Sequence, residues 1–301
     1  MRGFDISSYQ GGIDFNSIKE NVDFLILRAG YTGWGTGVDY NKDFYFEDFY
    51  NKAKSRDIPV GAYWYSCANT YEKGVAEANY MYENCLKGKK FEFPIYIDVE
   101  EERHQTIGKT FITSAIRGFC ETLEKLGYYV GIYANLNFFN NYINTPALYM
   151  YDKWFAYWKD DLNKPAFPYG DYGMWQNGTK GIVSNMDQID TDIAYIDYPT
   201  IIKNAGLNGY DKNNNIGNEL DKYTDVELAK RVIDGVYGVG EERALQLGDR
   251  YSSVQNLINV AYDVIDGKFG NGEERYKNIT EIGYNYNDVQ DIVDYIMLGD
   301  N

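Results

Sequence analysis

Residues 93–102, F-P-I-Y-I-D-V-E-E-E, are the stretch around which the rest of the chain is organised. The first half is apolar, aromatic and β-branched, which is typical of a strand buried on both faces, and the second half is acidic. Side chains two apart on a strand share a face, with Cα atoms roughly 6.5–7 Å apart, so Asp98 and Glu100 are expected to project together from the strand's carboxyl end. Two close carboxylates in a partly apolar place separate each other's pKa values, as a glycosidase requires. Taken alone, the stretch is interpreted equally well as a strand running into an acidic, solvated loop.

Composition excludes several classes of function. The 301 residues, 44% of them hydrophobic and 17% aromatic, suit one large α/β domain with a smaller part and exclude a disordered chain. The net charge of −16 argues against nucleic acids and anionic membranes as partners. Any affinity for a polyanionic bacterial surface must therefore come from specific pockets. The 31 tyrosines suit a sugar-binding groove, but compositional drift accounts for most of them equally well.

Cysteine and histidine are scarce. Cys67, Cys85 and Cys120 are an odd number without zinc-ligand spacing, and His104 is the single histidine. We therefore expect a reducing place of synthesis, no disulfide scaffold, no metal site and no cofactor. The start, MRGFDISSYQ, has no apolar core of a signal peptide, and no later window approaches 18 apolar residues, so neither a signal peptide nor a membrane span is expected.

Strand and helix patterns alternate through the first 200 residues. Helices are expected at 14–22, 41–56, 71–86 and 110–126, with a helical turn at 137–142, and strands at 3–7, 24–29, 58–66, 93–98, 128–134, 154–158, 173–176 and 189–195. Such alternation predicts a parallel α/β sheet or a (β/α) barrel, irregular at its end because the last three strands leave no room for full helices.

Acids and aromatics recur at the carboxyl ends of these strands. In a (β/α) barrel those ends carry the catalytic residues, so this rim favours an enzyme. The residues concerned are Asp5, Tyr63, Tyr65, Asp98, Glu100, Tyr133, Trp158, Trp175, Gln176 and Asp190.

The last third of the chain contains an internal repeat behind a polar stretch. Residues 206–224 are rich in Asn and Gly without periodicity and are interpreted as a linker. Residues 227–243, ELAKRVIDGVYGVGEER, recur at 259–275 as NVAYDVIDGKFGNGEER, an offset of 32. Each copy predicts a three-helix bundle of under ~40 residues, marginally stable alone. Arg243 and Arg275 are interpreted either as structural salt-bridge residues or as part of a sugar- and peptide-binding pocket shaped by the glycine-rich turn.

Residues 1 to about 200 resemble the family 25 glycoside hydrolases, the Chalaropsis-type lysozymes found among phage endolysins and bacterial autolysins. The resemblance rests on four ordered pieces: G-F-D-I-S-S-Y-Q at 3–10, G-A-Y-W-Y at 61–65, I-Y-I-D-V-E at 95–100, and W-Q at 175–176 followed by I-D-T-D at 189–192. It implies a flattened, irregular (β/α) barrel that hydrolyses the β-1,4 bond between N-acetylmuramic acid and N-acetylglucosamine.

Roles are carried over by position. Glu100 resembles the general acid. Asp98 resembles the second carboxylate, which orients the substrate's own 2-acetamido nucleophile; direct attack by Asp98 is the lesser alternative. Asp5 and Asp190 resemble two further acids, and Asp190 is preferred over its neighbours Asp187 and Asp192. Trp64 stands where many members carry His, so no histidine is expected in the site. The residues expected to contact substrate are Gln10, Tyr63, Tyr65, Tyr133 and Trp175.

The C-terminal copies resemble the CW-seven type of cell-wall-binding repeat, which implies affinity for the disaccharide–dipeptide part of peptidoglycan. Val239 takes the place of Asn271 in the first copy, so that copy would bind more weakly if Asn271 contacts ligand, and two linked sites would gain avidity. The residues singled out are Tyr237, Gly238 and Arg243 in the first copy, and Phe269, Gly270, Asn271 and Arg275 in the second.

The expected organisation is a catalytic domain at 1–205, a linker at 206–224, and wall-binding repeats at 225–258 and 259–301. The leading hypothesis is an endolysin muramidase, made in a host cytoplasm and released to the bacterial wall by a separate holin-like protein. The alternatives are an autolysin of the same chemistry, a non-catalytic wall-binding protein and a chitinase-like hydrolase. The oligomeric state stays open.

Overall fold

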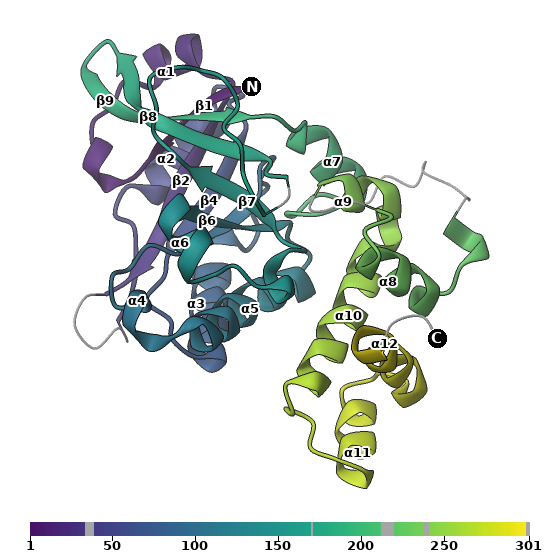
Figure 1. Cartoon of the computed structure of the whole chain (residues 1–301). Helices are drawn as coiled ribbons and strands as arrows, with labels where there is room; N and C mark the ends of the chain where they lie inside the picture. The colour runs from purple at the N-terminus through teal and green to yellow at the C-terminus, as the bar shows by residue number, and fades with distance from the viewer. Residues whose placement is uncertain (34–38, 170, 212–219, 238–240, 299–301) are drawn as a thin grey trace.

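A computed structural model describes residues 1–33, 39–169, 171–211, 220–237 and 241–298. Its larger part is a closed barrel (Figure 1). The barrel order is β1, β9, β8, β7, β6, β5, β4, β2 and back to β1. The strands are β1 (Arg2–Ile6), β2 (Phe24–Thr32), β4 (Val60–Tyr65), β5 (Ile95–Asp98), β6 (Val130–Asn135), β7 (Asp152–Ala156), β8 (Met174–Val183) and β9 (Met186–Ala194). The predicted irregular (β/α) barrel is confirmed.

The irregularity lies where the sequence predicts it. Every barrel pairing from β1 through β2 and on to β8 is parallel, whereas β9 runs antiparallel to both β8 and β1. Only residues 184 and 185 separate β8 from β9. A parallel connection needs a dozen or more residues, so this short link forces a hairpin.

Helices cover the outside of the barrel. They are α1 (Phe15–Asn21), α2 (Phe46–Lys54), α3 (Tyr71–Met81), α4 (His104–Ile107), α5 (Lys109–Lys125), α6 (Leu136–Asn141) and α7 (Tyr198–Ala205). The helix expected over 41–56 begins only at Phe46, because β3 (Tyr40–Lys42) pairs with the edge of β2 and Asp43 then ends the strand. Helices α3 and α5 approach closely through glycine: a Cβ on Gly74 would lie 2.0 Å from the Ala115 carbonyl oxygen.

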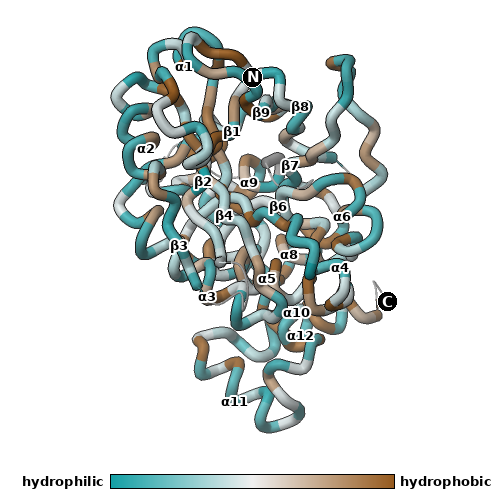
Figure 2. Tube along the Cα trace, turned by 90° about the vertical axis from the view of Figure 1, so that its left-hand side faces the viewer, coloured by the Kyte–Doolittle hydropathy of each residue, from teal (hydrophilic) through white to brown (hydrophobic). Residues whose placement is uncertain are grey.

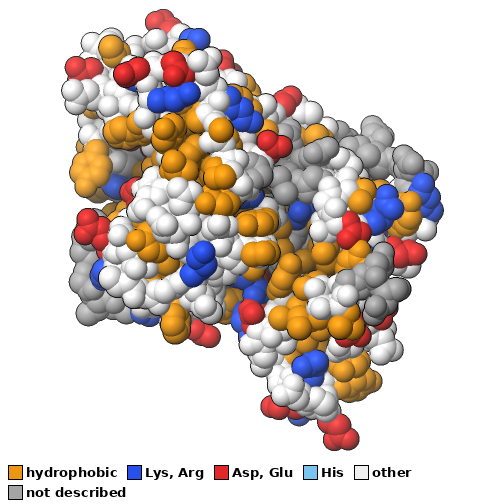
Figure 3. Space-filling view, viewed as in Figure 1, with side chains coloured by type: hydrophobic (Ala, Val, Ile, Leu, Met, Phe, Trp, Pro, Cys, Tyr) orange, Lys and Arg blue, Asp and Glu red, His pale blue; other side chains and the backbone are white. Residues whose placement is uncertain are grey.

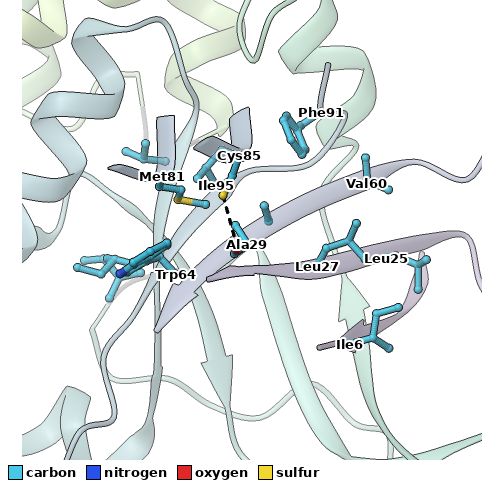
Figure 4. Close-up of a cluster of buried hydrophobic side chains, with 14 of the residues drawn as sticks. Ile6, Leu25, Leu27, Ala29, Val60, Trp64, Met81, Cys85, Phe91 and Ile95 are labelled. Atoms are coloured by element: carbon cyan, nitrogen blue, oxygen red, sulfur yellow. Dashed lines mark hydrogen bonds between the residues drawn. The ribbon is translucent and has the colours of Figure 1, made fainter. Parts of the chain in front are cut away.

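Strand side chains alternate between two apolar layers. Phe24, Ile26 and Tyr96 fill the barrel interior, whereas Leu25 and Leu27 face the surrounding helices. Figure 4 shows part of the outer layer, in which Met81 and Cys85 reach the strands and the Cys85 thiol lies 3.5 Å from the Ala29 carbonyl oxygen.

The stretch predicted as a linker is in part packed structure. Asn208 is fully buried; its side-chain oxygen accepts from the Tyr129 amide at 2.7 Å and its side-chain nitrogen donates to the Phe93 carbonyl oxygen at 2.9 Å. Tyr210 donates to Glu92. These bonds attach residues 207–210 to the segments that precede β5 and β6. The linker prediction is therefore wrong for 207–210. A single buried Asn leaves no periodic signal. Residues 212–219 of the predicted linker lie outside the described residues.

The C-terminal part is helical and consists of α8 (Asp225–Ile233), α9 (Glu241–Leu247), α10 (Tyr251–Ile265), α11 (Glu273–Glu281) and α12 (Tyr286–Leu298). Helix α10 packs against both α8 and α12, and α12 also packs against α8. The boundary predicted at 258/259 falls inside α10, because no helix-breaking residue occurs between Tyr251 and Ile265. The two copies therefore share one helix. No helix in the described ranges is long and apolar enough to cross a membrane.

The helical part is docked on α5 through buried ions, and apolar side chains gather where it meets the barrel (Figure 3). Arg117, 5% exposed, donates to Glu121 at 2.7 Å and to Asp263 of α10 at 2.9 Å, and it also pairs with Asp266. Lys268 bonds Asp263 at 2.6 Å and lies 3.1 Å from the centre of the Tyr71 ring. The carboxylates hold the pKa of Arg117 above its usual value despite burial.

We expect Arg117→Ala to lower the free energy of unfolding by about 3–5 kcal/mol, because it leaves the fully buried carboxyl of Glu121 without its cation and removes one of the two cations of Asp263. Urea unfolding at neutral pH measures the change. The control is Lys277→Ala, which removes an exposed pair with Glu281 at 3.6 Å and should change stability by less than about 1 kcal/mol. Equal effects of the two variants would contradict a structural role for the cluster.

Candidate active site

A cavity of about 500 Å³ opens at the carboxyl ends of the strands. The β1, β2, β4, β5 and β9 strands each supply side chains to it or to the loops just beyond them. The carboxyl ends of β1, β2, β4 and β5 meet because these strands are parallel, and the antiparallel β9 passes beside them along β1. The lining residues are Asp5, Ile6, Ser7, Ser8, Tyr9, Gln10, Arg28, Tyr31, Tyr63, Tyr65, Asp98, Glu100 and Asp190.

Asp98 and Glu100 both border this cavity, as expected from their spacing. Asp98 is 3% exposed, and its Oδ1 atom has no hydrogen-bond partner among the described residues. Burial raises the pKa of Asp98 well above its usual value, and repulsion from Glu100 and Asp5 adds to the rise. Glu100 reaches solvent at the mouth. Its carboxyl is nevertheless partly desolvated, which raises its pKa, and Asp190 and Glu101 add to the rise. The two acids therefore hold protons more strongly than free carboxyls do.

Across the cavity, β1 and β9 bring two further acids face to face. Their register pairs Asp5 with Asp190. Gln176 donates to Asp5 at 2.9 Å. Burial raises the pKa of Asp5 well above its usual value and that of Asp190 to about 6. Of the three neighbouring acids weighed from the sequence, Asp190 borders the cavity and Asp187 is exposed in the hairpin.

Asp192, the third of these acids, lies beneath the site. It is 1% exposed and accepts from the indole nitrogen of Trp154 at 2.8 Å, and burial, with repulsion from Asp5, raises its pKa well above its usual value. Asp192 therefore holds β9 against Trp154 inside the barrel and does not line the cavity.

The cation of the site is Arg28, which the sequence reasoning missed. Its Nε atom donates to Asp43 at 2.8 Å and an Nη atom donates to Ser8 at 2.7 Å, while the guanidinium lies over the rings of Tyr9 and Tyr31. Its charge opposes the rise in the pKa of Asp98. A signal was available, because an arginine inside the apolar run F-L-I-L-R-A requires a buried partner.

Most residues expected to contact substrate lie in or beside the cavity. Tyr63 and Tyr65 line it, and Tyr65 donates to Glu101 at 3.2 Å. Tyr133 donates to Gln176 at 3.0 Å. Gln10 also lines the cavity, but its side-chain oxygen accepts from the Ser7 amide at 2.9 Å, so it holds the loop after β1 in shape.

The expectation for Trp175 is wrong. Its side chain is fully buried in the outer layer, where its indole nitrogen donates to the Tyr157 carbonyl oxygen at 2.7 Å. Alternation explains the error: Gln176 faces the site, so Trp175 one residue earlier faces outward. The exposed indole beside the site belongs to Trp158, 58% exposed, which donates to Gln176 at 3.1 Å.

In the helical part, the structure places the two arginines of the repeats alike. Arg243 donates to Gln255 at 2.9 Å and Arg275 to Gln290 at 3.3 Å. Arg275 also bonds the Gly270 carbonyl oxygen and Asn271. Three further predicted residues are structural or not described. Tyr237 is buried and accepts from Arg231, Phe269 is partly buried in the helical core, and Gly238 lies outside the described residues.

Both the barrel and the C-terminal helical part match known protein families. The model for glycosyl hydrolases family 25 matches residues 4–186, and the CW_7 repeat model matches 226–260 and 258–297. The autolytic lysozyme of Clostridium acetobutylicum is 28% identical over 254 residues, covering 82% of this chain and 72% of that protein.

Solved structures agree with the fold. The CTP1L endolysin is 25% identical with a TM-score of 0.58, covering 68% of this chain and 70% of that one. A family 25 glycosyl hydrolase from Bacillus anthracis is 27% identical with a TM-score of 0.53, and the match covers 65% of this chain and 89% of that one.

The raised pKa of Asp190 predicts a pH-dependent gain in stability for Asp190→Asn. An acid whose pKa is about 6 when folded and about 4 when unfolded stabilises the fold below pH 4, and that contribution is lost as the pH rises through 6. The variant should therefore equal the wild type near pH 4. Above pH 6 it should be more stable by on the order of 1 kcal/mol, a value reduced for solvent screening.

Thermal unfolding between pH 4 and pH 8 measures this difference. Asp187→Asn, which removes an exposed carboxyl of the same hairpin, is the control for the loss of one negative charge. A gain for Asp190→Asn that is the same at every pH would refute the link to its titration.

Proposed function

This chain belongs to family 25 of the glycosyl hydrolases, and from that premise we propose that it is a muramidase in which Glu100 is the general acid and Asp98 assists the substrate's acetamido group. The family makes the chain a peptidoglycan hydrolase of the lysozyme type, and the CW_7 matches bear out the resemblance of its C-terminal copies. The observation that carries the proposal is the pair Asp98 and Glu100 at the end of β5, bordering an acid-lined cavity.

Glu100 fits the proton donor because of its position and environment. It reaches solvent at the mouth, where a leaving sugar can depart. Its desolvated carboxyl, with Asp190 and Glu101 nearby, has a raised pKa and so keeps a proton closer to neutral pH. A general acid needs this combination of reach and proton retention. The proton passes from Glu100 to the glycosidic oxygen as the bond to the anomeric carbon breaks.

Asp98 fits the assisting carboxylate. Its buried Oδ1 atom, without a partner among the described residues, suits an acceptor for the N–H of a bound 2-acetamido group. Such a bond favours the charged form of Asp98 and opposes the burial and repulsion that raise its pKa. The amide oxygen then attacks the anomeric carbon, and Asp98 stabilises the resulting oxazolinium ion. Substrate-assisted families of this kind are exceptions to the protein-nucleophile scheme. A covalent glycosyl ester trapped on Asp98 would contradict this assignment.

The other residues of the site have supporting roles in this scheme. Asp5 acts by charge on Asp98 and Asp190 on Glu100, and Arg28 opposes the rise in the pKa of Asp98. Tyr63, Tyr65 and Tyr133 offer rings and hydroxyls to sugar, and Trp158 replaces Trp175 as the exposed indole. An exposed ring beside a polar groove is a typical stacking surface for a sugar face.

The biological setting is proposed as that of an endolysin that a separate holin-like protein releases to the wall. The likeness to the CTP1L endolysin supports it. An autolysin is the second candidate, favoured by the likeness to the autolytic lysozyme of Clostridium acetobutylicum. The neighbouring genes decide between them. Adjacent genes for a holin and for virion proteins indicate an endolysin, whereas a location among genes of cell division and wall turnover indicates an autolysin.

We expect Glu100→Gln to reduce hydrolysis of purified peptidoglycan by about 10²–10⁴-fold, because it removes the proton donor while keeping the side chain's shape. Mass spectrometry of the soluble fragments measures it: the wild type should release reducible muramic-acid ends and the variant should not. Reducible glucosamine ends would show a glucosaminidase instead. Sedimentation with walls should be the same for both proteins, and full activity of the variant would refute the assignment.

Trp158→Ala should raise KM for peptidoglycan by about 5–30-fold, the effect of losing roughly 1–2 kcal/mol of ring contact, and should leave the fold intact. Steady-state kinetics and thermal unfolding measure the two effects. The matched variant Trp175→Ala should instead lower stability by about 3–5 kcal/mol, because that indole is fully buried. The opposite pattern would restore Trp175 as the substrate contact.

A further inference from the structure

The two C-terminal copies repeat one chain of hydrogen bonds. In the first copy Arg243 donates to Gln255, and Gln255 donates to Asn259 at 3.2 Å. In the second, Arg275 donates to Gln290, and Gln290 donates to Asp294 at 2.8 Å. We name the surface formed by Arg243, Gln255 and Asn259 the first polar face, and that formed by Arg275, Gln290 and Asp294 the second polar face.

The first polar face is covered by the barrel. Arg243, Gln255 and Asn259 are each 3% exposed or less. Asn259 donates to Glu124 of α5 at 2.8 Å, and Gln255 contacts the sulfur of Met150 at 3.0 Å. Burial raises the pKa of Glu124 to about 8, and the bond from Asn259 and the charge of Arg243 oppose that rise. The catalytic domain thus fills this face with a carboxyl group and an apolar side chain.

The second polar face is open. Asp294 is exposed, and Arg275 and Gln290 are partly exposed. Helix α11, which carries Arg275, extends away from the barrel at the far end of the molecule (Figure 1, Figure 2). Burying a carboxylate without a cation is costly, whereas a neutral amide with a partner is buried readily. Asp294 in place of Asn259 therefore keeps the second polar face in water.

We propose that the two copies divide their work: the first polar face is the permanent dock of the catalytic domain, and the second alone binds the carboxylate-bearing peptide part of peptidoglycan. This rests on the proposed function, since the wall is the substrate there. Each chain then has one wall-binding site, and the avidity expected from two linked sites does not arise.

The first copy supplies the argument for the ligand's chemistry, because its equivalent face holds the carboxyl of Glu124. A guanidinium has five N–H donors, and Arg275 uses three in its bonds to Gly270, Asn271 and Gln290, so donors remain for a carboxylate. Asp294, with its exposed carboxylate, accepts from the amide N–H groups of the same ligand. A peptide-substituted amino sugar offers both groups.

The test is hydrogen–deuterium exchange of the full chain during titration with N-acetylglucosaminyl-N-acetylmuramoyl dipeptide, which lacks the bond that a muramidase cleaves. We expect protection over 270–294 and none gained over 243–259. Arg275→Ala should shift the midpoint over 270–294 at least tenfold, and Lys277→Ala, on the same helix, should not shift it. The same disaccharide without its dipeptide should protect 270–294 at least tenfold more weakly.

Several results would overturn the proposal. They are added protection over 243–259, an unchanged midpoint with Arg275→Ala, equal protection by the peptide-free disaccharide, or no protection over 270–294 at all. Thermal unfolding shows whether Arg275→Ala is folded, and Asn271→Ala, at an exposed turn residue bonded to Arg275, is the substitute if it is not. Protection near Asp98 and Glu100 reports the catalytic cavity separately. Failure of the muramidase assignment therefore appears in the peptidoglycan digests and leaves this titration unaffected.

Discussion

The antiparallel insertion of β9 between β8 and β1 is the constraint on which the site depends. It closes the barrel, and its register places Asp190 beside Asp5, across the cavity from Asp98 and Glu100. A slip of one residue would turn Asp190 away and bring its neighbours to the cavity. The β8–β9 pairing changes register three times between the hairpin and the site, and the hydrogen bond of Asp192 to Trp154 inside the barrel holds β9 in place there.

Closure of the barrel brings several carboxyl groups together inside it, where burying their negative charge opposes folding. Asp5, Asp98 and Asp192 are nearly fully buried, and burial and mutual repulsion raise the pKa of each. At neutral pH these buried acids lower the free energy of unfolding relative to a cavity lined by neutral side chains. The same desolvation keeps protons available for glycosidic chemistry, so instability and function share one physical cause. Arg28 is the cation that limits the repulsion, and Asp43 and Ser8 hold it in place.

The second constraint is the dock between α5 and α10. Arg117 joins acids of both helices, while Asn259 and Glu124 extend the contact at the first polar face. A bundle of under ~40 residues buries too little surface to be stable alone, so a repeat gains stability by packing against a larger domain. Because α10 belongs to both copies, holding the first copy also orients the second, which projects away from the barrel (Figure 1). The catalytic cavity and the second polar face are thereby held at a set separation.

The sequence by itself determined the alternation of strands and helices, the pair Asp98 and Glu100, and the repeat of 32 residues, because each depends on spacing along the chain. Only the tertiary structure decided which face each side chain takes and what covers it. It turned Trp175 outward and left Trp158 at the site, and it brought Arg28 into the acid-lined cavity. It also buried Arg243 and left its counterpart Arg275 partly open. Those outcomes depend on which residues distant in the chain come into contact, and spacing along the chain contains no information about that.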